Sequence, residues 1–231
     1  SQSLTLSGDT VTQWNDKSGN DRHALAEVGT PKLSTTGGIN GLPYIQFRQD
    51  SGEDYLQVSG SEFFAKHMFF ICRSPTENWG NYGGILGHQN GRNSNYLFQS
   101  GNKGFHANQN PLFVSKNGQS LDSKNDFDLV TINQFMILEI MVNENDTSAK
   151  SNYKVGRNDN TTTDFDVIEI LAFEYELGVE REDLLQYLGY RSGISMPGQA
   201  LVQGAKTTAI GRAYLFDKMN LREASPGEVT R

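Results

Sequence analysis

Acidic side chains in two apolar segments are the residues of this sequence whose type and spacing could support bond cleavage. The segment DFDVIE contains Asp164, Asp166 and Glu169, and Glu139 stands alone in the apolar run FMILEIMV. In a strand, residues two apart face the same side, and a bulge can bring a third carboxylate to that side. Two carboxyl groups about 5–5.5 Å apart can cleave a glycosidic bond, one as nucleophile and one as acid. These four residues are the candidate catalytic set.

A second group of residues could bind a sugar without cleaving it. The segment NWGNYGGILGHQNGRNSNYLFQ, residues 78–99, places two aromatic rings among glycines and amides rather than among aliphatic side chains, and HANQN follows it. A ring can stack on the C–H face of a sugar while amide and guanidinium groups bond its hydroxyls. The alternative is a structural hairpin whose Trp packs on the core. The predicted ligand-binding residues are Trp79, Tyr82, His88, Asn90, Arg92, Asn93, Asn95, His106 and Asn108.

Two oxygen-rich segments could hold calcium, the one cofactor that the composition suggests. NENDTS supplies four neighbouring candidate ligands, Asn143, Glu144, Asn145 and Asp146. Asp16, Ser18, Asn20 and Glu27 occupy positions 1, 3, 5 and 12 of an EF-hand-like loop, but position 6 lacks the required Gly. The alternative for both segments is an ordinary polar turn.

Composition and charge restrict the class of protein. The net charge is −7 and the basic residues are scattered, which argues against nucleic-acid binding because phosphates need a contiguous Lys/Arg patch. No apolar run reaches the roughly 18–20 residues of a membrane span. Cys72 is the only cysteine, so we expect a buried free thiol and no internal disulfide. The four histidines show no metal-ligand spacing, and no G-x-S-x-G motif is present.

The elements that must position these residues are short strands. Apolar runs alternate with clusters of Gly, Asn, Asp and Ser, which is typical of an all-β antiparallel sandwich. One helix is expected in GVEREDLLQYLGYRSG, where acids occupy the first turn, leucines recur at helical spacing and Gly193 can end the helix. We expect this helix to pack on one edge of the sandwich. The predicted strands are 10–14, 44–47, 55–58, 68–73, 84–88, 95–99, 104–108, 127–131, 135–143, 153–157 and 167–175, with a further one or two near 207–216.

Several segments, taken in order, resemble the laminin-G-like members of the concanavalin A-like lectin/glucanase superfamily. They are VTQWNDKSGNDRHA, GINGLPYIQF, DYLQV and DFDVIEILAFEYELGVEREDLLQYLGYR, and the similarity covers about residues 8–195. The strand DFDVIE is also similar to the E-x-D-x-x-E strand of laminarinase-type glycoside hydrolases, with Asp164 in place of the nucleophilic Glu. It matches better the Glu-bearing strand of the laminin-G-like family, which as a rule is not catalytic.

The resemblance implies a two-sheet antiparallel jelly roll with one short helix, spanning residues 1–198. Residues 199–231 form a C-terminal extension without a counterpart in the family, and we expect residues 200–231 to contact a partner chain or the domain itself. Family members usually begin one strand earlier, so an edge strand is missing or supplied by another segment. Trp14 is expected to pack into the core while NDKSGN turns the chain.

The fold is compatible with glycan binding, glycan cleavage and adhesion, and does not choose among them. The expected function is a non-catalytic, lectin-like recognition or adhesion module that binds glycan or another surface ligand. It is expected to be part of a larger extracellular, cell-surface or virion attachment protein. One alternative is a structural or decoration protein of a phage or viral particle. The other is a glycan-cleaving enzyme that uses the acids of the concave sheet.

Overall fold

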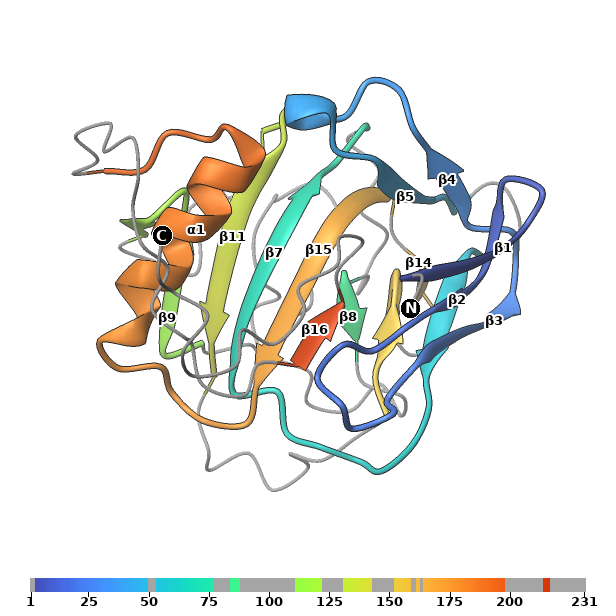
Figure 1. Ribbon diagram of the computed structural model, residues 1–231, viewed down its shortest axis with the longest axis horizontal. Helices are drawn as coiled ribbons and strands as arrows, with labels where there is room; N and C mark the ends of the chain where they lie inside the picture. The colour runs from blue at the N-terminus through green and yellow to red at the C-terminus, as the bar shows by residue number, and fades with distance from the viewer. Residues whose placement is uncertain are drawn as a thin grey trace, which may run out of the picture.

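The computed structural model describes residues 3–49, 53–76, 84–87, 111–121, 131–142, 152–158, 161–162 and 164–197, together with the backbone of Tyr214–Phe216. Within these residues the chain is mostly antiparallel β-structure with one α-helix (Figure 1). The strands are β1 Leu4–Ser7, β2 Thr10–Trp14, β3 Ala24–Val28, β4 Lys32–Ser34, β5 Tyr44–Phe47, β6 Tyr55–Val58, β7 His67–Arg73, β8 Leu86–Gly87, β9 Phe113–Lys116, β10 Gln119–Ser120, β11 Met136–Met141, β12 Lys154–Val155, β13 Arg157–Asn158, β14 Thr161–Thr162, β15 Phe165–Phe173 and β16 Tyr214–Phe216. The helices are η1 Ile39–Gly41, a single 3₁₀ turn, and α1 Glu180–Ser192.

The described strands form one continuous hydrogen-bonded sheet, apart from the separate pair β13–β14. Their order is β10-β9-β11-β7-β15-β5-β4-β2-β3-β6-β12-β8, with β1 beside β2 and β16 beside β15. The prediction of an all-β antiparallel protein with one helix is therefore confirmed. The finer prediction of two separate sheets is not confirmed, because hydrogen bonds connect the strands into one large open sheet.

One apolar core receives side chains from both parts of this strand order. Trp14, Leu56 and Val155 come from β2, β6 and β12, and they belong to the same buried cluster as Phe70 of β7 and Leu138 of β11. Trp14 is 1% exposed, which confirms that its indole is part of the core. The two parts of the sheet thus share one buried face.

Turn chemistry in the sequence explains how adjacent strands are joined. Between β9 and β10, Asn117 and Gly118 both have positive φ, 52° and 75°, which is the backbone of a type I′ hairpin turn. Lys116 consequently pairs with Gln119 across the turn. The side chain of Asn117 also accepts a hydrogen bond from the backbone N–H of Ile137 on β11, which fixes the hairpin to the sheet.

Helix α1 lies on the other face of the sheet, at the side of β9 and β11 in Figure 1. Its buried residues Leu184, Leu185 and Leu188 belong to a second apolar cluster that includes Phe69, Ile71, Ile137 and Leu171. Gly193 ends the helix with φ 72°, as the sequence predicts. Arg181 and Arg191 bind Glu139 of β11 and Glu169 of β15, so the helix lies on a face of the sheet and not beside its last strand.

Most of the predicted strands correspond to observed ones. β2, β5 and β6 have the predicted bounds, and β7, β8, β11, β12, β13 and β15 differ at their ends. The segment ALAEV also reads as a strand, and it forms β3. The sequence did not predict β1, β4, β9, β10 and β14, which are two to four residues long. The predicted strands 95–99 and 104–108, and all but residue 131 of the predicted strand 127–131, lie outside the described residues. Part of the C-terminal extension joins the sheet, because β16 pairs with Ile170–Ala172 of β15.

Candidate functional site

Glu139 lies at the centre of a buried polar cluster between the sheet and helix α1. Its carboxylate is 0% exposed and accepts hydrogen bonds from Arg181, with distances of 2.6 Å from Nε to Oε1 and 2.8 Å from Nη2 to Oε2. His67 Nε2 lies 2.9 Å from Oε1, and the Ser115 hydroxyl donates to Oε2. His67 Nδ1 accepts the backbone N–H of Leu177, so its Nε2 must carry the proton toward Glu139. The cluster therefore ties β7, β9 and β11 to the start of α1.

Two opposing effects determine the ionisation of Glu139. Burial disfavours its charged form, but hydrogen bonds from His67, Arg181 and Ser115 favour that form more strongly, so the pKa of Glu139 lies below its usual 4.5. The Glu139 hydrogen bond also raises the pKa of Arg181. Glu139 is accordingly an ionised partner of Arg181, and no described neighbour raises its pKa into the range of a general acid at neutral pH.

Glu169 and Asp166 form three further ion pairs on β15. Arg191, in the last turn of α1, donates from Nη1 to Glu169 Oε2 at 2.7 Å. Asp166 is 0% exposed and binds two guanidinium groups, Arg48 Nη2 at Oδ1 and Arg73 Nε at Oδ2, both at 2.7 Å. These three carboxylates of β11 and β15 are therefore each neutralised by at least one arginine.

Asp164 has a different role at the start of β15. Its Oδ1 accepts the backbone N–H of Gln49 at 2.8 Å, and its Oδ2 accepts the Thr76 hydroxyl at 3.0 Å. Ser74 donates to the Asp164 carbonyl oxygen at 3.3 Å. The residue thus joins the ends of β5, β7 and β15.

Glu139 and Glu169 lie on one face of the sheet, as the catalytic alternative requires, but α1 covers this face. Glu139 pairs with Phe69, which pairs with Leu171, so Glu139 and Glu169 are two strands and two residues apart. At ordinary strand dimensions their Cα atoms are about 12 Å apart. Their arginine partners come from opposite ends of the helix. The geometry that these acids support best is a clamp that holds α1 on the sheet.

The predicted EF-hand-like loop uses its first residue to close a turn. The Asp16 carboxylate accepts Ser18 N at 2.8 Å, Ser18 Oγ at 2.7 Å and Arg22 N at 3.1 Å. Glu27 lies in β3 and accepts the Tyr55 hydroxyl at 3.2 Å. In the described part of the chain, no three His, Cys, Asp or Glu side chains are grouped so that they could hold a metal ion.

The predicted sugar-binding and calcium-binding loops are not among the residues that the structure describes. This applies to Trp79, Tyr82, His88, Asn90, Arg92, Asn93, Asn95, His106, Asn108, Asn143, Glu144, Asn145 and Asp146. The structure does describe β8, which lies within the sugar-binding segment, and β7 and β9 on either side of it. Residues 88–112 connect β8 and β9, which lie at or next to opposite ends of the strand order.

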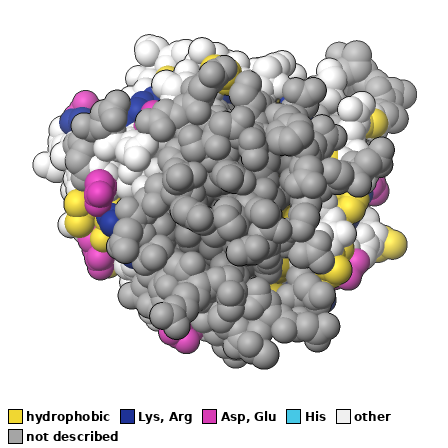
Figure 2. All heavy atoms as spheres, turned by 180° about the vertical axis from the view of Figure 1, so that it is seen from behind, with side chains coloured by type: hydrophobic (Ala, Val, Ile, Leu, Met, Phe, Trp, Pro, Cys, Tyr) yellow, Lys and Arg dark blue, Asp and Glu magenta, His cyan; other side chains and the backbone are white. Residues whose placement is uncertain are grey.

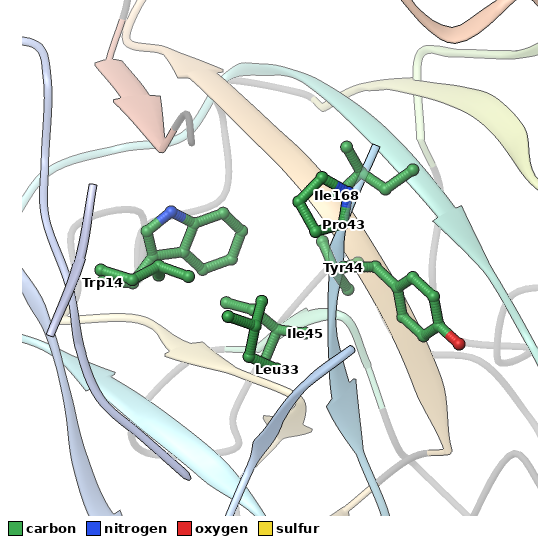
Figure 3. Close-up of a pocket in the computed structure, with 8 residues that line it drawn as sticks. Trp14, Leu33, Pro43, Tyr44, Ile45 and Ile168 are labelled. Carbon is green, nitrogen blue, oxygen red and sulfur yellow. The ribbon is translucent and has the colours of Figure 1, made fainter. Parts of the chain in front are cut away.

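A small apolar hollow lies where β5 leaves β15 (Figure 3). Its lining includes Trp14, Leu33, Pro43, Ile45 and Ile168. Its cavity volume is about 10 Å³, about the space of one water molecule, so the hollow is too small for a sugar. The hollow also lacks the convergent polar groups that orient a small molecule.

Sequence reasoning identified the acids but missed the cations that hold them. A lone acid in an apolar strand predicts a cationic partner, because an unpaired buried charge is costly. That signal could have pointed to arginines, and Arg181 and Arg191 are both on the predicted helix. It could not have assigned Arg181 to Glu139 and Arg191 to Glu169.

Charged side chains are mixed on the described surface. Figure 2 shows Lys and Arg next to Asp and Glu at the border of the face opposite to that of Figure 1. No helix in the described residues is long and apolar enough to span a bilayer. Comparison with family models, curated proteins and solved structures finds no match to this chain.

Proposed function

We propose that the chain is a non-catalytic recognition module that binds a glycan on a laminin-G-like jelly roll. The observation that carries the proposal is that three acids of the main sheet are bound to arginines. Glu139, Asp166 and Glu169 are buried and bound to arginines, as a structural clamp requires. A glycosidase instead needs one carboxyl with a raised pKa and a second one free to attack.

The shared core supports the finer proposal for the fold. Trp14 and Leu56 from one part of the sheet belong to the same buried cluster as Phe70 and Leu138 from the other. A jelly roll has this arrangement, in which two layers face each other across one core. The resemblance to the laminin-G-like family agrees with it, from Trp14 to the helix at Glu180–Ser192.

The proposed ligand-binding residues fall in two connections: Trp79 and Tyr82 come between β7 and β8, and the others come between β8 and β9. Loops on a rigid β-scaffold commonly carry binding residues. Trp79 and Tyr82 supply rings, and Arg92 with the neighbouring asparagines supplies hydrogen-bonding groups. In this proposal the oxygen-rich residues 143–146 bind calcium, and the protein acts at a cell or virion surface.

A glycan array tests the proposal directly. The full chain is compared with Trp79→Ala, with and without a calcium chelator. Tyr190→Ala is the matched control, because Tyr190 is an aromatic residue on α1 that is 83% exposed. We expect specific glycan retention that Trp79→Ala abolishes and Tyr190→Ala preserves, with unchanged near-UV circular dichroism. Absence of any retained glycan, or full retention by folded Trp79→Ala, would overturn the proposal.

One observation favours a second candidate, a structural protein of a particle whose C-terminal residues contact neighbouring chains. The backbone of Tyr214–Phe216 pairs with β15. The extension is therefore able to add a strand to a sheet. Deleting residues 200–231 should leave glycan retention intact under the first proposal, and should abolish assembly under the second.

A further inference from the structure

One edge of β15 pairs with a single strand, and the other edge pairs with two shorter ones. On one edge, β7 pairs with β15 from Asp166 to Phe173. On the other edge, β5 pairs only with Phe165–Val167, and β16 pairs with Ile170–Ala172. All nine residues of β15 are buried. The edge beyond Val167 is thus completed by a segment from the far end of the chain.

The surroundings of this edge suit an extended apolar segment. Tyr214, Leu215 and Phe216 are apolar, and they pair with Ala172, Leu171 and Ile170 in antiparallel register. The apolar hollow lined by Trp14 and Ile168 lies next to Val167, where β5 leaves β15 (Figure 3). Recognition by strand addition combines such backbone pairing with apolar contacts.

The pairing between β16 and β15 is short, which favours exchange of β16 between molecules. Three residue pairs join β16 to β15, whereas seven join β7 to β15. Each backbone hydrogen bond contributes only about 0.5–1.5 kcal/mol net. Residues 198–213 precede β16, and these sixteen residues can span at most about 55 Å when extended. This span is the upper limit on the distance between Pro197 and the strand that β16 joins.

We propose that the edge of β15 at Ile170–Ala172 is a strand-acceptor site, and that residues 214–216 of a second copy of this chain fill it when copies associate. A segment exchanged between identical chains makes the same contacts in the pair as within one chain, and a mutual exchange forms a closed dimer. The acceptor does not depend on glycan binding.

Disulfide trapping in the full chain tests the acceptor. Ala172 and Tyr214 are directly opposite. Such pairs have Cα atoms about 4.5–5.5 Å apart, within the range of a disulfide. Ala172→Cys and Tyr214→Cys are prepared separately, mixed at increasing concentration, oxidised and analysed on non-reducing gels. Phe216→Cys replaces Tyr214→Cys in the control, because Phe216 faces Ile170 instead. Native Cys72 is buried and its thiol pKa is raised by burial, so it stays in place.

The outcomes distinguish a strand β16 that comes from the same chain from one that comes from a second copy. We expect a cross-linked dimer of one Ala172→Cys and one Tyr214→Cys chain, about tenfold more abundant than with Phe216→Cys. If the double variant Ala172→Cys/Tyr214→Cys forms only an intrachain disulfide and the mixture forms none, the strand is not exchanged and the proposal fails. If neither forms a disulfide, the acceptor site itself is refuted.

A second measurement needs no substitution in the core. The dimer fraction of the unmodified chain is followed by light scattering while a synthetic peptide of residues 210–219 is added, with a scrambled peptide as control. We expect the dimer fraction to rise with protein concentration and to fall several-fold with the matching peptide only. A chain that remains monomeric at every concentration, or a dimer that both peptides leave unchanged, contradicts the exchange.

Discussion

Arg181 of α1 binds Glu139 of β11 through both carboxylate oxygens, with N–O distances of 2.6 and 2.8 Å. Arg191 binds Glu169 ten residues later on the same helix, at 2.7 Å. The two pairs hold the ends of α1, and Leu184, Leu185 and Leu188 between them pack on the sheet. Two of the four acids that first suggest chemistry, Glu139 and Glu169, are therefore the attachment points of the helix.

Removing the arginine at the start of this clamp should destabilise the fold. Arg181→Met leaves Glu139 buried without its main countercharge, and we expect a loss of about 3 kcal/mol in the free energy of unfolding. Urea unfolding followed by circular dichroism measures it. Glu182→Gln is the control, because Glu182 also contacts Arg181 but is largely exposed, and should change stability by less than about 0.5 kcal/mol. Equal losses in the two variants would contradict the clamp.

The lowered pKa of Glu139 predicts how stability depends on pH. The unfolded chain binds a proton at Glu139 near pH 4.5, whereas the folded chain does so only at lower pH, so this group stabilises the fold above that pH. The contribution should decrease as pH falls below about 4.5 toward the folded pKa. The free energy of unfolding between pH 7 and pH 3 should therefore fall less steeply for Glu139→Gln than for the unmodified chain. If the free energy of unfolding depends on pH equally in both chains, Glu139 is not the group that causes the loss of stability in acid.

Cys72 should be unreactive while the chain is folded. Its thiol is 0% exposed on β7, and burial raises its pKa, so little thiolate is available. We expect an aromatic disulfide reagent to modify it at least about a hundredfold more slowly in buffer than in denaturant, because reaction requires unfolding. Rapid stoichiometric modification of the folded chain would contradict this burial.

Two glycines with similar backbone conformations should respond differently to alanine. Gly156 has φ 87°, and a Cβ there would lie 2.4 Å from Phe47 Cδ1, whereas Gly19 has φ 84° and no atom within 4 Å. Both substitutions incur the strain of a left-handed residue, about 1–2 kcal/mol. Gly156→Ala additionally forces Phe47 to move, and we expect it to cost about 2 kcal/mol more in denaturant unfolding. Similar costs would mean that the core around Phe47 is not tightly packed.

Local signals in the sequence were sufficient for several elements. The bounds of β2, β5 and β6 follow from short apolar runs between turn residues, and α1 follows from its acidic first turn and from Gly193. The missed strands β4, β10 and β14 are only two or three residues long, and β1 and β9 have four residues each. Strands this short carry too few alternating positions for a pattern to be visible.

Less of the candidate site than of the fold could be predicted from the sequence. The sequence identified Asp164, Asp166, Glu169 and Glu139 as unusual, because acids inside apolar strands need a reason to be there. It could not show that Arg48 and Arg73 converge on Asp166, since these residues lie more than ninety positions away along the chain. Only strand pairing brings them within hydrogen-bonding distance.

The sequence by itself determined the all-β class, the helix, the burial of Trp14 and the solitary thiol, because each depends on neighbours along the chain or on composition. The tertiary structure decided that the strands join in one sheet, that α1 lies on a face and that each acid of the clamp has its own arginine. It also placed β16 beside β15, forty-one residues after Phe173. The physical reason is that strand pairing and buried ion pairs join residues distant in sequence, and no local pattern specifies which distant partner is chosen.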